Sequence, residues 1–155
     1  MNIEFTLNGR KVSVEIEADE ALYSVLRRLG MYSVKCGCET SNCGLCTVHM
    51  DDRAVRSCSV PAARCAGHRI TTMEGLQQEA RILGDCLAGE GAEQCGFCAP
   101  GLMMNEFALA RENPNASADE IDAFLAGNLC RCSGYVSQRR AVQKYLKIKA
   151  EEVRA

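Results

Sequence analysis

Four of the five cysteines between residues 35 and 58 constrain the fold of this chain more than any other feature of its sequence. Three stand at C-x4-C-x2-C spacing and the fourth follows after eleven intervening residues: Cys38, Cys43, Cys46 and Cys58. This spacing places three thiolates in one loop, so a later segment has to return the fourth to the same place. Gly37 and Gly44 lack a Cβ and let backbone N–H groups of the loop approach a bound group. The sequence therefore predicts a loop that wraps around a metal centre.

The spacing of these four cysteines distinguishes between two kinds of metal centre. It is the spacing of a plant-type 2Fe-2S site, in which four thiolates hold the cluster. Structural zinc usually takes two C-x2-C pairs roughly 15 to 20 residues apart, which this pattern fits poorly. We therefore interpret the four cysteines as ligands of a first 2Fe-2S cluster, with zinc as the alternative.

A second group of cysteines follows in the second half of the chain. Two short motifs, C-G-F-C and C-R-C, are separated by 31 residues and contain Cys95, Cys98, Cys130 and Cys132. Each motif adjoins the expected start of a helix, where free N–H groups and the helix dipole favour thiolates and an anionic cluster. Arg131 adds a positive charge between two of these cysteines. These features predict a second 2Fe-2S cluster between helices, and spacing alone leaves zinc open here as well.

The chain contains eleven cysteines in 155 residues. Its first residues lack the basic start and apolar run of a signal peptide, and no stretch is apolar enough to span a membrane. We therefore expect metal-ligating cysteines in the reducing cytoplasm rather than disulfides. Three cysteines lie outside the two groups. We expect Cys65 and Cys86 in the core. Cys36 is the less favoured choice as a ligand, because using it in place of Cys38 would change the four-residue interval before Cys43.

The sequence lacks the signs of a site that transforms an organic substrate. Its net charge of −2 provides no basic surface for nucleic acid. Neither His49 nor His68 lies in a Cys-x-His pair, and His49 is interpreted as a surface or hydrogen-bonded histidine. There is no Ser/His/Asp set or phosphate-binding glycine motif. The acidic residues are scattered and expected on solvated faces. The chain is therefore predicted to carry electrons.

Local patterns predict an α+β chain with a β-rich first half and a helical second half. Asn8-Gly9 favours a type I′ turn and predicts a β-hairpin within residues 1–20. Further strands are expected at 46–50, 54–58 and 69–71, and helices at 21–29, 79–87, 100–111, 117–126 and 138–149. Ser117 and Glu120 form a capping-box signal, and Pro100 suits the first position of a helix. We expect a ferredoxin-like domain at residues 1–75 and a helical domain at residues 76–155.

Three motifs make the chain resemble a known family over nearly its whole length. They are S-V-K-C-G-C-E-T-S-N-C-G-L-C-T-V, Q-C-G-F-C-A-P-G and G-N-L-C-R-C-S-G-Y, in this order. With them the chain resembles the small iron–sulfur subunit of molybdenum hydroxylases, of the xanthine dehydrogenase, aldehyde oxidoreductase, carbon monoxide dehydrogenase and nicotinate dehydrogenase types. The resemblance implies an N-terminal plant-ferredoxin-like β-grasp domain and a C-terminal four-helix bundle. It also implies two 2Fe-2S clusters, held by Cys38, Cys43, Cys46 and Cys58 and by Cys95, Cys98, Cys130 and Cys132.

The resemblance further implies partners and a route for electrons. A large subunit would hold a molybdenum–pterin cofactor that hydroxylates the substrate, and a medium subunit would hold FAD, in a heterotrimer that can dimerise. Electrons would pass from molybdenum through the cluster of the helical half and then the ferredoxin-like cluster to FAD. Gln94 and Cys132 match positions that lie against the pterin. A purine or another N-heterocycle is expected as the substrate, because such enzymes are common in the family.

The chain departs from the commonest family motifs without losing a cysteine ligand. Ser41 stands where glycine is usual and Leu45 where alanine is usual. The resemblance therefore leaves the loop conformation and the potential of the first cluster open. Two other functions remain as alternatives: a freestanding two-cluster electron carrier of the ferredoxin type, and a zinc-stapled interaction module.

Overall fold

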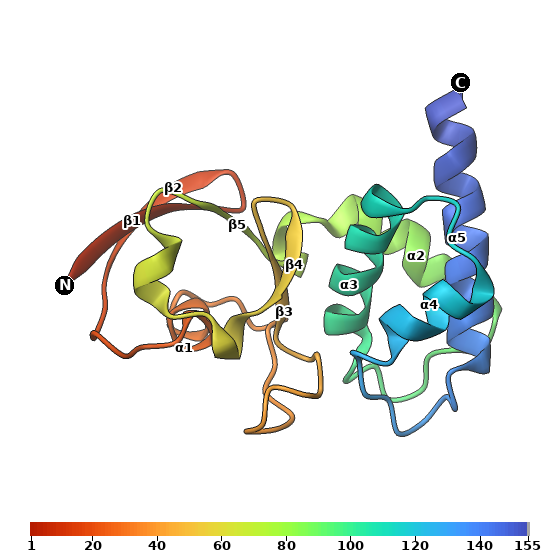
Figure 1. Cartoon of the computed structure of the whole chain (residues 1–155), viewed down its shortest axis with the longest axis horizontal. Helices are drawn as coiled ribbons and strands as arrows, with labels where there is room; N and C mark the ends of the chain where they lie inside the picture. Colours follow the sequence, from red (N-terminus) through yellow and green to blue (C-terminus); the bar gives the residue numbers. More distant parts are fainter. Residues whose placement is uncertain (155) are drawn as a thin grey trace.

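The computed structural model describes the backbone of residues 1–154 and the side chains of residues 1–152. A β-rich half and a helical half lie side by side, and the two ends of the chain point away from each other (Figure 1). The predicted α+β class, with a ferredoxin-like sheet followed by a four-helix domain, is confirmed. The chain passes between the halves through the 3-10 helix η3 (Met73–Gly75). The division into residues 1–75 and 76–155 stays a prediction.

The β-rich half is built on a five-stranded mixed sheet in the order β2-β1-β5-β3-β4. Its strands are β1 (Asn2–Leu7), β2 (Arg10–Glu15), β3 (Thr47–Met50), β4 (Arg53–Arg56) and β5 (Arg69–Thr71). Strand β1 pairs antiparallel with β2 and parallel with β5, whereas β3 pairs antiparallel with β4 and β5. Asn8 and Gly9 both have positive φ, as a type I′ turn requires, so the predicted hairpin is confirmed.

Helix α1 (Leu22–Arg28) packs with the sheet and forms the first core. Its buried side chains alternate along β1 and recur at helical spacing along α1: Ile3, Phe5, Leu7, Leu22, Val25 and Leu26. The sequence periods of two and 3.6 residues therefore correspond to buried faces. Cys65, on the 3-10 helix η2 (Ala62–Cys65), is buried in this core as predicted, and burial raises the pKa of its thiol to about 11.

The helical half consists of α2 (Gln77–Gly89), α3 (Ala99–Glu112), α4 (Ala118–Leu125) and α5 (Val136–Arg154). Ser117 and Glu120 form the predicted capping box at the start of α4. Pro100 is the second residue of α3 rather than the first, because the helix already begins at Ala99. Among the described helices, none is long and apolar enough to cross a bilayer.

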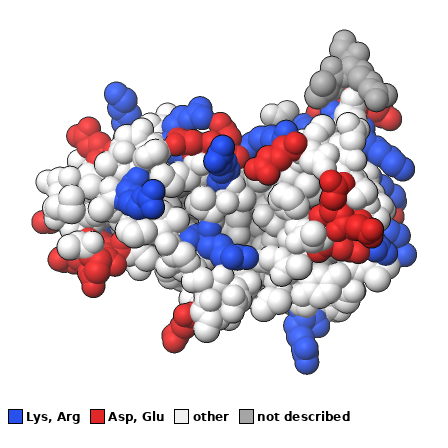
Figure 2. All heavy atoms as spheres, viewed as in Figure 1, with Lys and Arg blue, Asp and Glu red and all other residues white. Residues whose placement is uncertain are grey.

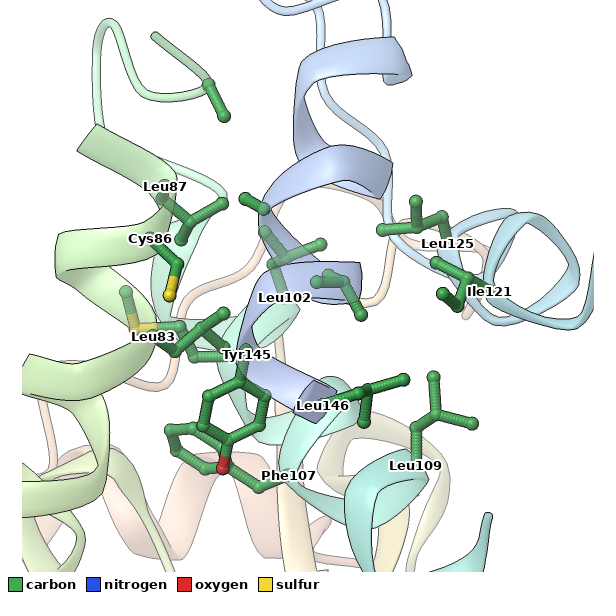
Figure 3. Close-up of a cluster of buried hydrophobic side chains, with 14 of the residues drawn as sticks. Leu83, Cys86, Leu87, Leu102, Phe107, Leu109, Ile121, Leu125, Tyr145 and Leu146 are labelled. Carbon is green, nitrogen blue, oxygen red and sulfur yellow. The ribbon is translucent and has the colours of Figure 1, made fainter. Parts of the chain in front are cut away.

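Side chains from all four of these helices meet in a second core (Figure 3). It includes Leu83, Cys86, Leu87, Leu102, Phe107, Leu109, Ile121, Leu125, Tyr145 and Leu146. The ring centroids of Phe107 and Tyr145 lie 5.9 Å apart in a tilted arrangement, which aromatic pairs prefer. The buried Tyr145 donates its hydroxyl to the Glu79 carboxylate at 2.5 Å, so its polar end is satisfied. Cys86 is a core residue, as predicted.

One acidic residue contradicts the expectation that the acidic side chains lie on solvated faces. Glu106 of α3 is fully buried, and neither oxygen of its carboxyl group has a hydrogen-bond partner among the described residues. Burial raises the pKa of Glu106 to about 8, because the charged form is costly in an apolar interior. Elsewhere, on the face shown in Figure 2, acidic and basic side chains are interspersed on the surface.

The two halves meet where α3 packs against the sheet and the first cysteine loop. A Cβ on Gly101 would lie 2.4 Å from the carbonyl oxygen of Gly44 and 2.9 Å from the Cα of Leu45. Real Cβ atoms do not approach backbone atoms this closely, so the contact requires glycine at position 101. The backbone of the helical half therefore touches the backbone of the first cysteine loop directly.

A histidine forms a second link between the halves. His49 of β3 is buried, and its Nε2 donates to the carbonyl oxygen of Met104 in α3 at 2.6 Å. Its Nδ1 accepts a hydrogen bond from Arg111 at 3.0 Å. Both ring nitrogens are thus occupied in the neutral form, so His49 is the satisfied histidine that the sequence predicted.

Candidate metal centres

The first cysteine group lies on the loop between α1 and β3, and its fourth member comes from a short 3-10 helix after β4. That helix is η1 (Ser57–Ser59), so Cys58 does not end a strand as predicted. Strand β4 stops earlier, because the N–H and the hydroxyl of Ser57 both donate to the carbonyl oxygen of Cys46, at 3.2 and 2.8 Å. These bonds turn the chain and place Cys58 beside Cys46.

The four thiols of the first group lie in two neighbouring pairs. Cys38 lies beside Cys43, whose backbone N–H donates to the Cys38 sulfur at 3.4 Å. Cys46 lies beside Cys58, whose sulfur is 3.5 Å from the hydroxyl oxygen of Ser41. Each iron of a 2Fe-2S cluster takes two protein ligands, so two adjacent pairs are the arrangement that such a cluster requires.

Backbone N–H groups and burial act in opposite directions on these thiols. The N–H of Cys43, followed by that of Thr40, lowers the pKa of Cys38 to about 6. Burial raises the pKa of Cys46 to about 11. Because the buried side of the loop disfavours bare thiolates, a bound cation is the natural way to stabilise them there.

The second cysteine group lies on the two loops that lead into α3 and α5. Figure 1 places both loops, and the first cysteine loop, along the same edge of the molecule. Cys95 and Cys98 precede α3, with Cys98 at its N-cap, and Cys130 and Cys132 lie between α4 and α5. The sulfur of Cys132 is 3.7 Å from that of Cys95, and Cys98 lies beside Cys130. The four cysteines of the two motifs are therefore brought together, again as two pairs.

Hydrogen-bond donors also face the sulfurs of the second group. Burial would raise the pKa of Cys130, but the hydroxyl and N–H of Ser133 outweigh it and lower this pKa to about 7. The backbone N–H of Phe97 lowers the pKa of Cys95. Burial raises the pKa of Cys98 to about 11. Donors directed at ligand sulfurs stabilise an anionic cluster and influence its potential.

The residues present fit two 2Fe-2S clusters better than two single metal ions. Each group offers four thiols in two adjacent pairs, with N–H or O–H groups directed at the sulfurs. A structural zinc site takes four ligands around one ion, whereas each iron of a 2Fe-2S cluster takes two protein ligands. The pairwise arrangement therefore favours the two-iron interpretation.

Two further residues of interest lie at the surface of the second group, and one lies beside the first. The side-chain amide of Gln94 donates to the carbonyl oxygen of Cys132 at 3.2 Å, and both residues are exposed. The two positions that the resemblance places against a pterin are thus adjacent. Cys36 is exposed and its thiol donates to the carbonyl oxygen of Cys38 at 3.1 Å, so it belongs to neither sulfur pair.

Hydrogen bonds that were not foreseen from the sequence tie the two cysteine groups together. The backbone N–H of Leu129 donates to the carbonyl oxygen of Cys43 at 2.9 Å. The side-chain amide of the buried Asn128 donates to the carbonyl oxygen of Gly44 at 3.1 Å. Both residues come directly before Cys130 in the G-N-L-C-R-C-S-G-Y motif. Their place in this motif was the feature of the sequence that could have indicated a role at the site.

Comparison with known proteins identifies the family. A family model described as a 2Fe-2S iron-sulfur cluster binding domain matches residues 5–80, and one described as a 2Fe-2S binding domain matches residues 72–143. The chain is 36% identical over 146 residues to the nicotinate dehydrogenase small FeS subunit of Eubacterium barkeri, which covers 92% of this chain and 93% of that relative. This small iron–sulfur chain belongs to the molybdenum hydroxylase family.

Two more comparisons agree with this assignment of the iron–sulfur subunit. The xanthine dehydrogenase iron-sulfur-binding subunit of Escherichia coli O157:H7 is 41% identical over 140 residues, with 87% of each chain covered. The crystal structure of quinoline 2-oxidoreductase from Pseudomonas putida 86 superimposes with a TM-score of 0.90 at 35% identity, over 97% of this chain and 96% of that chain. The iron–sulfur subunit thus contains two 2Fe-2S binding domains, as the motifs predicted.

Proposed function

We propose that this chain is the electron-transfer subunit of a multisubunit molybdenum hydroxylase and performs no substrate chemistry alone. Cys38, Cys43, Cys46 and Cys58 would hold the first 2Fe-2S cluster, in a domain of residues 1–75. Cys95, Cys98, Cys130 and Cys132 would hold the second, in a domain of residues 76–155. The observation that carries this proposal is the arrangement of both groups as paired thiols faced by hydrogen-bond donors.

When bound, each cluster supplies a site that accepts and releases one electron at a time. The chain's own residues hold the two sites at a fixed separation and exclude water from part of each. Cys43 and Cys46 are buried, whereas Cys95 and Cys132 are exposed at the other site. The hydrogen bond from Leu129 to the carbonyl oxygen of Cys43 connects the loops of the two sites. We propose that electrons enter at the exposed second site and leave through the first.

The surface around the second site supports a protein partner there. Three large apolar side chains are exposed beside its cysteines: Phe97 is 49% exposed, Leu129 54% and Val136 53%. Exposed apolar groups of this size commonly mark an interface. We propose that a large subunit with a molybdenum–pterin cofactor covers this surface, with Gln94 and Cys132 against the pterin. A medium subunit with FAD would face the first site and complete a heterotrimer that can dimerise.

An N-heterocycle such as a purine is our proposed substrate of the whole complex. The support comes from relatives whose names refer to nicotinate, xanthine and quinoline. The chain itself has no part in choosing the substrate under this proposal, because the choice would lie with the large subunit. We further propose a cytoplasmic location, in keeping with the many free cysteines.

Iron and sulfide analysis of the native complex tests the proposal. We expect about four irons and four sulfides for each copy of this chain, and two distinct 2Fe-2S signals by electron paramagnetic resonance (EPR) after dithionite reduction. Cys130→Ser should remove about two irons, the second signal and the hydroxylase activity. Cys86→Ala, which removes a core thiol outside both groups, is the matched control and should keep all four irons. Full activity in Cys130→Ser, or zinc without sulfide, would refute the proposal.

A freestanding two-cluster carrier is the competing function. Co-purification distinguishes the two, because a subunit elutes with its partners in fixed stoichiometry whereas a mobile carrier elutes alone. The apolar surface around Phe97 and Leu129 favours the subunit.

A further inference from the structure

Lys35 connects the loop of the first cysteine group to the loop of the second. Its backbone N–H donates to the carbonyl oxygen of Leu45 at 3.2 Å, which fixes the residue in the first loop. Its side chain crosses to the other half, where Nζ donates to the carbonyl oxygen of Phe97 at 3.1 Å. The same Nζ lies 4.8 Å from the centroid of the Phe97 ring. A cation from one domain is thus held against the C-G-F-C segment of the other.

Two backbone N–H groups near Phe97 face sulfurs of the second cysteine group, and the contact with Lys35 polarises the peptide that carries one of them. The N–H of Phe97 hydrogen-bonds to the sulfur of Cys95. The carbonyl group that accepts from Lys35 belongs to the peptide whose N–H, that of Cys98, lies against the Cys98 sulfur. A donor on a carbonyl oxygen polarises the whole peptide unit and strengthens the bond that its N–H makes. Lys35 therefore acts on the second cysteine group through the peptide backbone as well as through space.

We propose that Lys35 sets the reduction potential of the second cluster, although it belongs to the domain of the first. This inference rests on the proposed cluster ligands. Reduction of a 2Fe-2S cluster adds one electron, which converts one ferric ion to ferrous, and no bond to the protein forms or breaks. The reduced site carries one more negative charge than the oxidised site. A fixed cation and the polarised N–H···S bond of Cys98 stabilise that charge, so Lys35 raises the potential.

The proposal also accounts for the position of the residue. The cation is anchored in a loop of the β-rich half, whereas its acceptor Phe97 lies in the helical half, so its effect requires the two halves to be docked. Loss of docking would lower the potential of the second cluster without touching any of its ligands. Lys35 is in this sense a positioning residue that acts across the domain contact.

Potentiometric EPR titration of the native complex, with dithionite as the reductant, tests the role of Lys35. Lys35→Met removes the charge and the donor and should lower the equilibrium constant for reducing the second cluster roughly three- to tenfold, the scale of one charge at a partly exposed site. Lys35→Arg keeps both and should stay within about twofold of the wild type. Phe97→Leu removes the ring but keeps the peptide carbonyl, so it should shift the constant less than Lys35→Met does.

Lys11→Met is the matched control for the loss of one positive charge. Lys11 is an exposed lysine on β2, the strand at the edge of the sheet opposite β4 (Figure 1). The Lys11→Met variant should leave the reduction potentials of both clusters unchanged. An unchanged second potential in Lys35→Met, or an equal shift in Lys11→Met, would overturn the proposal.

Two further measurements separate the possible failures. Iron content of every variant shows whether the second cluster is retained. If Lys35→Met loses iron, Lys35→Gln, which keeps a donor and lacks the charge, provides the decisive measurement. Its second cluster should have a lower potential than that of the wild type, and an unchanged potential would overturn the proposal. Absence of the second 2Fe-2S signal in the wild-type complex would instead refute the proposed cluster ligands.

Discussion

The imidazole of His49 donates from Nε2 to the main-chain carbonyl oxygen of Met104 at 2.6 Å and so joins strand β3 to helix α3. Arg111 donates to the other ring nitrogen, which therefore cannot carry a proton in this arrangement. Burial lowers the pKa of His49 further below its ordinary value. The contact between the halves is consequently built on a neutral histidine.

Acid should weaken the protein through His49. The unfolded chain takes up a proton at this residue below about pH 6.5, whereas the folded chain resists it, so stability is lost as the pH falls through that value. His49→Gln should lower the free energy of unfolding at pH 8 by about 1–3 kcal/mol, from the loss of buried hydrogen bonds, and should flatten the acid side of the profile. Urea unfolding followed by circular dichroism from pH 5 to 8 measures both effects. His68→Gln, at an exposed histidine paired with Asp51, is the control and should keep the acid sensitivity.

Glu106 should produce the opposite pH dependence. Its pKa is raised from 4.5 to about 8 by burial, so between these values the unfolded chain releases a proton that the folded chain retains. Stability should therefore decrease as the pH rises through this window, by up to about 5 kcal/mol at roughly 1.4 kcal/mol per pH unit. Glu106→Gln should remove this slope in the same unfolding experiment. An unaltered slope in Glu106→Gln would contradict the assignment, and Glu112→Gln, at the exposed end of α3, should behave as wild type.

Gly101→Ala should disturb the contact between the halves. The new Cβ would lie 2.4 Å from a backbone oxygen of the first cysteine loop, so either the loop or α3 has to move. We expect a loss of about 1–3 kcal/mol in stability and reduced iron content at the first site. Gly89→Ala, at the end of α2 with nothing within 4 Å of the added Cβ, should be neutral or slightly stabilising. Equal iron content and stability in the two variants would show that the contact is dispensable.

Ser41→Gly should distinguish two effects of Ser41: the strain of its backbone, which affects stability, and the hydrogen bond of its hydroxyl to a sulfur, which affects the potential of the first cluster. Ser41 has a φ of 60°, which glycine adopts without strain, and its hydroxyl lies 3.5 Å from the sulfur of Cys58. The glycine variant should be slightly more stable, yet the first cluster should have a lower potential, because one donor to a ligand sulfur is lost. Ser41→Ala lacks the same hydroxyl and retains the strain, so its potential should match that of the glycine variant. Potentials that differ between the two variants would exclude the hydroxyl as the cause.

Sequence patterns predicted those parts of the fold that depend on short-range signals. The Asn8-Gly9 turn and the capping box of Ser117 and Glu120 were foreseen because each motif satisfies its own backbone groups locally. The two cysteine groups were foreseen because ligand spacing reflects the geometry of the metal centre.

Other features depend on tertiary packing and were missed for that reason. Glu106 was expected in solvent, but α3 packs against the sheet and against α4 and α5, and Glu106 is among the residues of α3 that this packing buries. Cys58 was placed at the end of a strand, but the bonds from Ser57 to Cys46 turn the chain first. Lys35 was noted only as part of the first cysteine motif. Its contact with Phe97 was missed because the two residues are 62 positions apart in the chain.

The bare backbone contact of Gly101 with Gly44 would also limit the distance over which electrons tunnel between the two proposed clusters. Tunnelling rates fall steeply with the gap between donor and acceptor, and two backbones without an intervening side chain approach as closely as polypeptide allows. Even a methyl group at this point would widen the gap between the two proposed clusters. A chimera that combines the β-rich half of one relative with the helical half of another would therefore conduct at the native rate only if both of its glycines were preserved.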